Sequence, residues 1–428
     1  YNRNTYPTKE IDSNSRLYWS GGIEFNLDSS IGFLRPKCVG GGSIVNQALI
    51  DRFDEDALSS WKEKSGVSFF NTNDMKSSYE AAESELHLQE IPAKYHNGNA
   101  KIFQDGFAKN GYKCSPLIRA QKDCKFEEGN SCIECLSGCR IDSKQSMPVA
   151  LLPKADTKFL AIESEFEVCK IEVNPNLVKI IGKNKFGATV NHFAKKLVLA
   201  SGAIGNSKLL LQSGMKIKMP SLGENFYTHP QYMLLGLYDF PVNSHLGPLQ
   251  SFKSSDPNFR AKGFKLENVF APPVAISMLI PGFEKKHQRL MKQITHLACI
   301  EVCVRDTHAG KIGVAKNGKV LITKTLNEED QKRRRLGIEA IHNIFSKTNA
   351  KEIIEGVLPI GLHLMGGLGI GVSGEKTVVS PDFSTHVFKN VFVSDSSIFP
   401  NAPGINPSLT IMALSKMSTP KIINSFKV

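Results

Sequence analysis

Two side chains near the carboxyl end of the chain, His363 and Asn406, have the chemistry needed to handle a proton and to hold an oxygen atom. The imidazole of His363 titrates near neutral pH and offers both a donor and an acceptor nitrogen. The amide of Asn406 also offers a donor and an acceptor. A lone histidine in an apolar run such as 362–365 is usually a core residue, and we interpret the other ten histidines in that way. His363 differs because of the segments that accompany it.

The segments that accompany His363 are 363–367, 393–400 and 404–411. Together they resemble the carboxyl-terminal signature of the glucose-methanol-choline (GMC) flavoenzymes, and the His/Asn pair resembles the cholesterol oxidase and long-chain alcohol oxidase-like branch most. The resemblance implies an α/β fold in which a discontinuous Rossmann-like FAD-binding domain joins a substrate domain with an antiparallel sheet and flanking helices. It also implies an FAD-dependent oxidoreductase that transfers hydride from an alcohol CH-OH group to flavin N5, with His363 as the base and Asn406 as the orienting group.

A glycine-rich turn at 40–42 leads into a short helix, and three adjacent glycines let backbone amides approach a ligand closely. Taken alone, such a turn is a weak indication of a cofactor loop. It resembles the family's first signature, which passes the pyrophosphate and the flavin ring. The resemblance therefore implies flavin contacts at Gly41, Gly42, Ser43 and Asn46.

An apolar strand at 196–200 runs into a glycine turn and then a helix at 208–211, the order in which parallel-sheet proteins meet a nucleotide. Residues 200–214 resemble the family's second signature, although Gly205-Asn206 stands where Ser/Thr-Pro is usual. The resemblance implies that the main chain of Val168 meets the adenine and that Asp395 meets the ribityl chain or the pyrophosphate. The further cofactor contacts that it implies are Ala200, Gly202, Ser396, Pro407 and Thr410.

The strand, G-x-G-x-x-G turn and helix that normally open a dinucleotide fold do not occur in this sequence. The chain begins at Tyr1 without an initiator methionine or an apolar signal, so we expect a preceding segment of a few tens of residues. A second hypothesis stays open, in which the chain is a degenerate GMC-like subunit with a structural role in a larger complex and no flavin. Bound flavin distinguishes the two.

Four cysteines, Cys124, Cys132, Cys135 and Cys139, have a C-x7-C-x2-C-x3-C spacing that suits an iron-sulfur cluster or zinc. The residues that follow make this stretch resemble a family segment that often binds no metal, so we predict reduced, metal-free thiols. The odd total of nine cysteines favours a reducing intracellular compartment over a disulfide framework. We interpret the others as small buried hydrophobic side chains: Cys38, Cys114, Cys169, Cys299 and Cys303.

We expect the FAD-binding domain to comprise 1–53, 124–230 and 359–428, and a cap and substrate domain to comprise 54–123 and 231–358. Within these domains the sequence predicts a helix start at 71–74, a hairpin over 167–181 and a helix over 327–347. The apolar stretch from Phe270 to Phe283 indicates a core strand with two prolines at its edge or the lining of an apolar substrate tunnel.

The length of 428 residues suits two packed domains, and the formal charge is +12. We interpret the charge as a lysine-rich solvated surface, although it also suits peripheral contact with anionic lipid or an acidic partner subunit. No nucleic-acid-binding motif accompanies it, and no stretch of about twenty apolar residues indicates a transmembrane helix. The expected partners are thus a small, apolar alcohol as substrate and an electron acceptor, either oxygen or a protein.

Overall fold

A computed structural model describes residues 3–427 and has the mixed α/β architecture that the family resemblance implied. Its α-helices in this part of the chain are α1 Glu10–Leu17, α2 Gly42–Val45, α3 Glu55–Ser65, α4 Thr72–Glu83, α5 Gly98–Lys109, α6 Cys132–Cys135, α7 Met147–Ala150, α8 Gly202–Gln212, α9 Pro257–Ala261, α10 Pro273–Leu279, α11 Glu284–Lys292, α12 Glu328–Lys347 and α13 Ser408–Asn424. Its strands are β1 Glu24–Phe25, β2 Gly32–Phe33, β3 Leu88–Glu90, β4 Cys114–Pro116, β5 Ile118–Ala120, β6 Glu167–Asn174, β7 Leu177–Lys183, β8 Thr189–Ala194, β9 Leu197–Leu199, β10 Phe226–Tyr227, β11 Pro230–Leu237, β12 Phe252–Ser254, β13 Phe264–Asn268, β14 Leu297–Val304, β15 Lys311–Val314, β16 Val320–Thr323, β17 Glu352–Glu355, β18 Ile360–Gly361, β19 Met365–Gly366 and β20 Val391–Val393.

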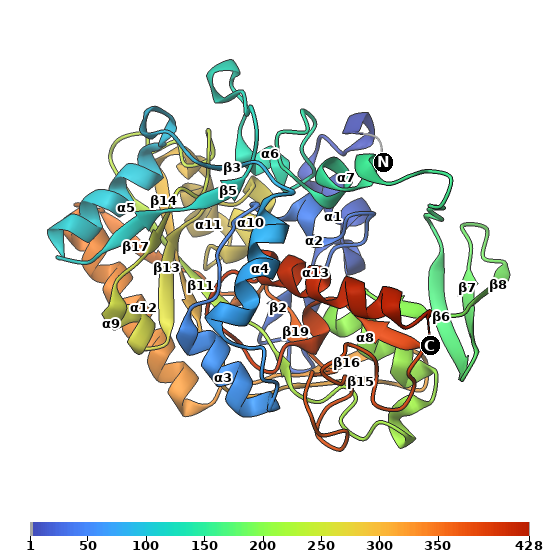
Figure 1. The fold of residues 1–428 in the computed structure, drawn as a ribbon. Coiled ribbons are helices and arrows are strands. Elements are labelled where there is room, and N and C mark those ends of the chain that lie inside the picture. Colours follow the sequence, from blue (N-terminus) through green and yellow to red (C-terminus); the bar gives the residue numbers. More distant parts are fainter. Residues whose placement is uncertain (1–2, 428) are drawn as a thin grey trace.

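The largest sheet has nine strands in the order β1-β2-β18-β11-β14-β13-β12-β4, with β17 also paired to β11. Its pairings are antiparallel except for the parallel contact between β18 and β2. Every residue of β14 is buried, so this central strand is covered on both faces. Helices α5 and α12 lie along one of these faces, at the left of the molecule in Figure 1.

The long helix α12 confirms the prediction of a helix over 327–347. It begins after Asn327, whose side-chain oxygen accepts a hydrogen bond from the backbone N–H of Asp330. Its apolar side packs on the sheet, and a Cβ atom at Gly337 would lie only 2.2 Å from a methyl carbon of Val302. A glycine at this point therefore lets the helix approach β14 closely.

A second layer contains a parallel pair of strands, β9 and β20. Strand β9 ends just before α8, which confirms the predicted order of strand, glycine turn and helix. Strands β6 and β7 form the predicted hairpin, and β8 extends it to three strands. In Figure 1 these three strands project at the right-hand edge of the molecule.

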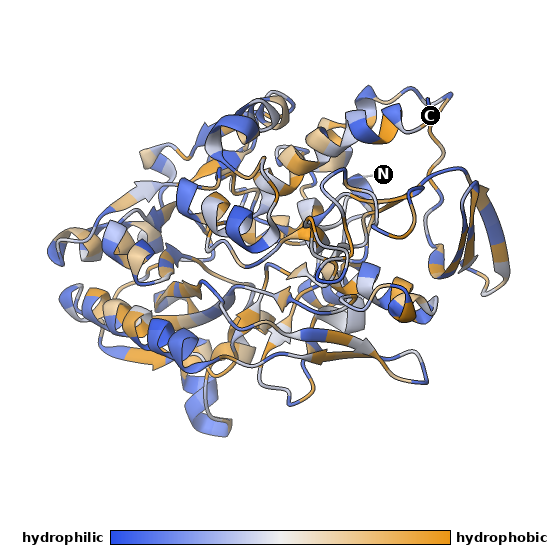
Figure 2. Cartoon of the chain, turned by 60° about the horizontal axis from the view of Figure 1, so that its bottom comes forward, coloured by the Kyte–Doolittle hydropathy of each residue, from blue (hydrophilic) through white to orange (hydrophobic). Residues whose placement is uncertain are grey.

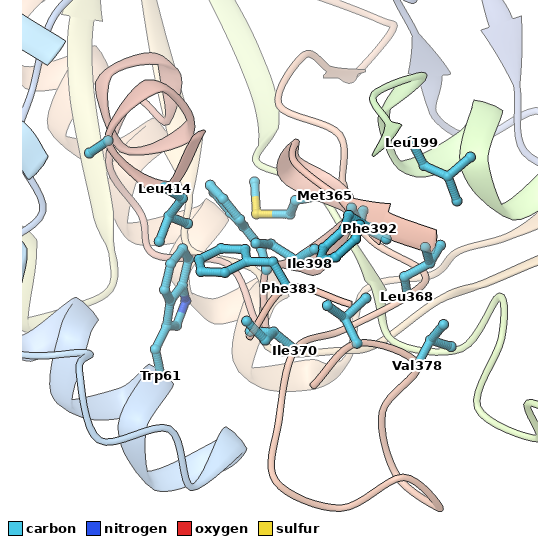
Figure 3. Close-up of a cluster of buried hydrophobic side chains, with 14 of the residues drawn as sticks. Trp61, Leu199, Met365, Leu368, Ile370, Val378, Phe383, Phe392, Ile398 and Leu414 are labelled. Carbon is cyan, nitrogen blue, oxygen red and sulfur yellow. The ribbon is translucent and has the colours of Figure 1, made fainter. Parts of the chain in front are cut away.

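A single apolar cluster joins α3, α4 and α13 to strands β9 and β20, and Figure 3 shows its centre. Trp61 on α3 is fully buried, with its ring centroid 4.4 Å from that of Phe399 and its indole N–H donating to the carbonyl oxygen of Asn401 at 3.0 Å. Helices α3 and α4 therefore belong to the core of the second layer, whereas α5 packs on the large sheet. Residues 54–123 therefore contribute helices to both layers.

The expectation of a core strand within 270–283 is wrong, because residues Pro273–Leu279 form helix α10. Pro273 occupies the first turn, where a missing N–H costs nothing. The carboxylate of Glu10 accepts hydrogen bonds from the backbone N–H groups of Val274 at 2.8 Å and Ala275 at 2.9 Å, so it satisfies the start of the helix from a distant part of the chain. Phe283 is 84% exposed and lines no tunnel.

Figure 2 shows hydrophilic residues along the outer turns of the helices and hydrophobic residues where the elements pack together. Over residues 3–427, no helix combines the length and the apolar character that crossing a bilayer would require. The predicted helix start at 71–74 is confirmed, since the Asn71 side chain caps α4 by accepting from Asp74 N–H.

We expect Trp61→Ala to lower the free energy of unfolding by about 3–5 kcal/mol, because it removes a large buried side chain and a hydrogen bond. The matched control Phe186→Ala removes an aromatic ring that is 81% exposed and should change stability by less than about 0.5 kcal/mol. Urea unfolding followed by circular dichroism measures both. A cost at Trp61 as small as that at Phe186 would contradict the assigned core.

Candidate active site

Over 264–267 and 301–304, the central strands β13 and β14 carry apolar side chains on one face and polar side chains on the other, as the alternation of a strand allows. Leu266 and Val302 point into the apolar cluster under α5 and α12. Their neighbours along the strands face the opposite side and remain almost inaccessible to solvent: Lys265, Glu267, Glu301 and Cys303. A row of ionisable groups thus lies inside the molecule.

The strand register sets these groups side by side. Cys303 pairs with both Gln231 on β11 and Lys265 on β13, and Glu301 pairs with Glu267. The Lys265 ammonium lies 2.7 Å from Glu267 Oε1, which balances one carboxylate charge. Burial and the neighbouring Glu267 raise the pKa of Glu301 well above its usual range.

Asn406 reaches this row from the loop that precedes α13. Its amide nitrogen Nδ2 donates to Asp51 Oδ2 and to Glu267 Oε1, both at 3.0 Å. Because both partners are carboxylate oxygens, they identify which end of the amide is the nitrogen. The side chain is buried, and its carbonyl end is directed away from the two acidic groups.

His363 lies beside the same row and contacts a second histidine, His229. Their Nδ1 atoms are 2.9 Å apart, and the rings meet edge-on at 86°. The other nitrogen of His229, Nε2, accepts a hydrogen bond at 2.9 Å from the backbone N–H of Gly404, two residues before Asn406. Burial lowers the pKa of His363 to about 3, with Lys265 contributing, and burial together with His363 lowers that of His229 well below its usual value.

A break in strand register brings the two histidines together. Phe226 pairs with Gly366, and Pro230 pairs with Gly361. Three residues intervene between these pairs on the first segment and four on the second, so the second segment bulges at the level of His363. Bulges re-aim side chains in this way and are frequent beside active sites. A Cβ atom at Gly366 would lie 1.9 Å from the carbonyl oxygen of Asn225, so the glycine after Met365 is required by this close approach.

Asp395, expected to contact the cofactor, uses both carboxylate oxygens within the chain. Oδ2 accepts from Gly202 N–H at 2.7 Å and from Asn206 Nδ2 at 2.8 Å, while Oδ1 accepts from Ser397 N–H at 2.9 Å. The departure from the family's second signature has a local reason, because the side chain of Asn206 joins Asp395 to Ser397. Ser396 donates to the carbonyl oxygen of Leu364, next to His363.

Hydrogen bonds from the cysteine segment hold the predicted glycine turn in place. The buried Lys144 ammonium donates to the carbonyl oxygens of Asn46 at 3.0 Å and Cys135 at 2.7 Å and also contacts that of Ile44. Ser43 donates to Gly40 O and accepts from the backbone N–H of Met147. The turn, the short helix α2 and the cysteine segment therefore form one unit.

Three glycines of the predicted cofactor surface face open space, since a Cβ atom at Gly41, Gly42 or Gly202 would meet no heavy atom within 4 Å. Ala200 is exposed at the end of β9. The remaining predicted contacts are less open. Val168 is half-buried on β6, Pro407 is buried before α13, and the buried hydroxyl of Thr410 is 2.8 Å from that of Tyr79.

Two sulfur atoms of the predicted cysteine cluster accept hydrogen bonds from buried basic residues. Arg119 donates to Cys132 Sγ at 3.2 Å, and the backbone N–H of Lys144 lies 3.5 Å from Cys139 Sγ. A hydrogen bond from the Cys135 thiol lowers the pKa of Cys139. Among the cysteines expected to be buried, Cys299 and Cys303 are buried, whereas the prediction is wrong for three that are only partly covered: Cys38, Cys114 and Cys169.

One group of three donor atoms within residues 3–427 has a spacing suited to a metal: His229, Cys303 and His363, with ligand atoms within 4.8 Å of one another. Both nitrogens of His229 already have hydrogen-bond partners, so a metal there would displace one of them. The geometry favours the hydrogen-bonded arrangement.

The chain belongs to the GMC oxidoreductase family: the amino-terminal family model matches residues 14–231 and the carboxyl-terminal model matches 313–415. Among its relatives, an uncharacterized GMC-type oxidoreductase of Sinorhizobium fredii is 26% identical over 93% of this chain and 83% of the relative. A long-chain-alcohol oxidase of Arabidopsis thaliana is 22% identical over 99% of this chain and 62% of its own length. The solved structure of pyridoxine 4-oxidase from Mesorbium loti has the same fold, with a TM-score of 0.71 at 14% identity, covering 98% of this chain and 92% of that one.

FAD is the cofactor of this family, and two features of the chain fit it. The turns at Gly41, Gly42 and Gly202 leave empty space beside the backbone, so a ligand can approach them closely. In the polar row, Gln231 Oε1 and Glu301 Oε2 are buried without a hydrogen-bond partner, so a bound molecule has groups to satisfy there.

From the sequence we interpret His229 as a core histidine without a role in the site, and the sequence does not single out Glu267 from Glu301 and Asp306. A signal for the carboxylates was present, because Lys265, Glu267, Glu301 and Cys303 alternate with apolar residues in otherwise core-like strands. Asp306 is engaged elsewhere, in a buried ion pair with Lys324 at 2.8 Å.

We expect the isolated protein to contain iron and zinc well below one atom per chain, because Arg119 and Lys144 already contact the cysteine sulfurs. Plasma mass spectrometry measures the metals. Stoichiometric iron or zinc that is retained in the control Cys114→Ser but lost in Cys135→Ser would contradict the prediction.

Acid should destabilise the protein through the two histidines. In the unfolded chain both titrate near 6.5, whereas in the folded chain their lowered pKa values keep them neutral. As pH falls below 6.5, the unfolded state therefore binds more protons, and the free energy of unfolding drops by up to about 2.7 kcal/mol per pH unit from this pair. His363→Gln should reduce that slope by about 1.4 kcal/mol per unit in urea unfolding between about pH 6.5 and 5. An unchanged slope would show that His363 is protonated in the folded state.

Proposed function

We propose that this chain oxidises the CH-OH group of a small-molecule alcohol, with His363 and Asn406 at the reacting oxygen. The observation that carries the proposal is the convergence of His363, Asn406 and the carboxylate of Glu267 in one buried polar site. Oxidising an alcohol requires that the hydroxyl proton leave while hydride leaves the carbon, so a donor and an acceptor must flank the oxygen. Bound FAD would supply the hydride acceptor at N5 of its ring.

The hydrogen-bond chain supports a donor role for His363. His229 Nε2 accepts from Gly404, so the single proton of a neutral His229 is on Nδ1 and points to His363 Nδ1. His363 then carries its own proton on Nε2. In this form it donates a hydrogen bond to the alcohol oxygen and stabilises the negative charge that develops there.

The donor form of His363 assigns the base to another group, which revises the expectation that His363 itself takes the proton. We propose Glu267, a carboxylate of the buried row whose Oε1 is 3.0 Å from Asn406 Nδ2. The same oxygen lies 2.7 Å from the Lys265 ammonium, and Glu301 stands opposite Glu267 on β14. We propose that Asn406 orients the hydroxyl and that the proton passes to Glu267.

An apolar alcohol is the proposed substrate class. The long-chain-alcohol oxidases of Arabidopsis thaliana support it by their names, since they align with 96–99% of this chain. The test is to load the protein with FAD, remove oxygen, and follow the flavin absorbance near about 450 nm while primary alcohols of increasing chain length are added. Bleaching that strengthens with chain length supports the proposal. A protein that binds no flavin would favour the structural-subunit hypothesis, and one that binds flavin without bleaching would point to another donor class.

Removing the donor should slow flavin reduction far more than it affects flavin content. We expect His363→Ala to lower the rate of flavin reduction on the order of 10²- to 10³-fold, the range for loss of one donor to a developing oxyanion. His363→Gln keeps a donor N–H and should retain more activity than the alanine variant. Undiminished reduction in His363→Ala would remove His363 from the mechanism, and Asn401→Ala, an amide outside the polar row, is the control.

A further inference from the structure

His229 contacts His363 and also the turn that precedes Asn406. One ring nitrogen meets His363 Nδ1 at 2.9 Å, and the other accepts from the backbone of Gly404 at 2.9 Å. We propose that His229 is a positioning residue that holds His363 in a single tautomer and fixes the turn that carries Asn406. This inference rests on the proposed function for its kinetic consequences, but the tautomer itself can be observed without any turnover.

The proton arrangement follows from counting donors. A neutral imidazole has one N–H and one acceptor nitrogen. The backbone N–H of Gly404 can only donate, so Nε2 of His229 must be the acceptor nitrogen. The N–H of His229 is then at Nδ1 and donates to His363. The neutral ring of His363 therefore accepts at Nδ1 and keeps its proton at Nε2. With no partner at Nδ1, His363 could adopt either tautomer, and in the wrong one it would present an acceptor to the alcohol oxygen.

The backbone around His229 leaves the ring little freedom. The N–H of Thr228 donates to Asp306 Oδ2 at 3.1 Å, and Asp306 is fixed in turn by the fully buried Lys324. On the other side, Pro230 pairs with Gly361 at the start of β11. The His229 side chain is itself completely buried. An anchored ring of this kind can orient a partner that lies on a bulged segment.

The second contact of His229 acts on the turn from 402 to 404. Arg305 Nε donates to Ala402 O at 3.3 Å and Arg260 Nη1 donates to Pro403 O at 2.8 Å, so two arginines hold two successive carbonyl groups. His229 holds the next backbone N–H, that of Gly404. A Cβ atom at Gly404 would lie 2.7 Å from Arg260 Nη1, which shows how closely this turn is packed. Asn406 follows two residues later.

A merely structural histidine would need only the Gly404 bond. Three variants distinguish a structural role of His229 from a positioning role. His229→Gln has an amide oxygen for Gly404 and an amide N–H for His363, so it can reproduce both bonds. His229→Asn has the same groups on a side chain that is one methylene shorter than that of glutamine. It cannot reach Gly404 and His363 at the same time. His229→Leu fills the space and removes both bonds.

The experiment measures two quantities on the FAD-loaded protein. Nitrogen NMR of ¹⁵N-histidine-labelled protein gives the tautomer of His363, whose signals are assigned by their loss in His363→Gln. Anaerobic mixing with the alcohol gives the limiting rate of flavin reduction and the alcohol concentration at half-saturation. His386→Gln, a histidine whose hydrogen bonds go to Gly371 and Thr377, is the control.

We expect wild type, His386→Gln and His229→Gln to show the Nε2–H tautomer of His363, with rates within about tenfold of one another. His229→Leu and His229→Asn should lose the single tautomer, with roughly 10²-fold slower flavin reduction at little change in half-saturation, as a misplaced catalytic group causes. A single Nε2–H tautomer in a folded His229→Leu, or equal rates in the leucine and glutamine variants, would overturn the proposal. If the leucine variant does not fold, the comparison of asparagine with glutamine decides. Failure of every protein to reduce flavin would remove the proposed function, while the NMR signals would still decide the positioning role.

Discussion

The buried row of ionisable groups on the inner face of the central sheet is the constraint on which the rest of the structure depends. Glu267 is 1% exposed, so its carboxylate needs partners other than water. It finds them in Lys265 on its own strand and in Asn406 from the carboxyl-terminal loop. Removing one partner of such a group costs more than an ordinary hydrogen bond contributes, because the charge stays buried. The folded sheet therefore requires the loop that bears Asn406.

That requirement connects the two layers. Helix α13 begins two residues after Asn406 and packs against α4 in the apolar cluster around Trp61. In the same layer, Asp395 at the end of β20 satisfies the first N–H of α8 and, through Asn206, the turn that follows β9. Short connections in this layer thus hold both the loop that bears Asn406 and the glycine turn at Gly202.

Local signals made much of this fold predictable from the sequence. The cap at Asn327 and the apolar spacing of Ile341 and Ile344 predicted α12, and the turn at 174–176 predicted the hairpin of β6 and β7. Predictions that depended on distant partners were less successful. The first turn of α10 is satisfied by Glu10, some 264 positions away, so its prolines suggested the edge of a strand. The contact between His229 and His363 could not be predicted, because it arises from a register break between two segments, and the closeness of those segments cannot be read from either one alone. The expected cofactor residues were identified by resemblance, and the open space at Gly41, Gly42 and Gly202 is the physical feature that supports them.

The central claim is that this site removes hydride from the carbon of an alcohol. The most direct test is the rate of anaerobic flavin reduction with an apolar primary alcohol and with the same alcohol deuterated at the hydroxyl-bearing carbon. If breaking that C–H bond accompanies flavin reduction, the deuterated alcohol must bleach the flavin more slowly at saturating concentration. Equal rates for the two alcohols, or a flavin that neither of them bleaches, would contradict the account.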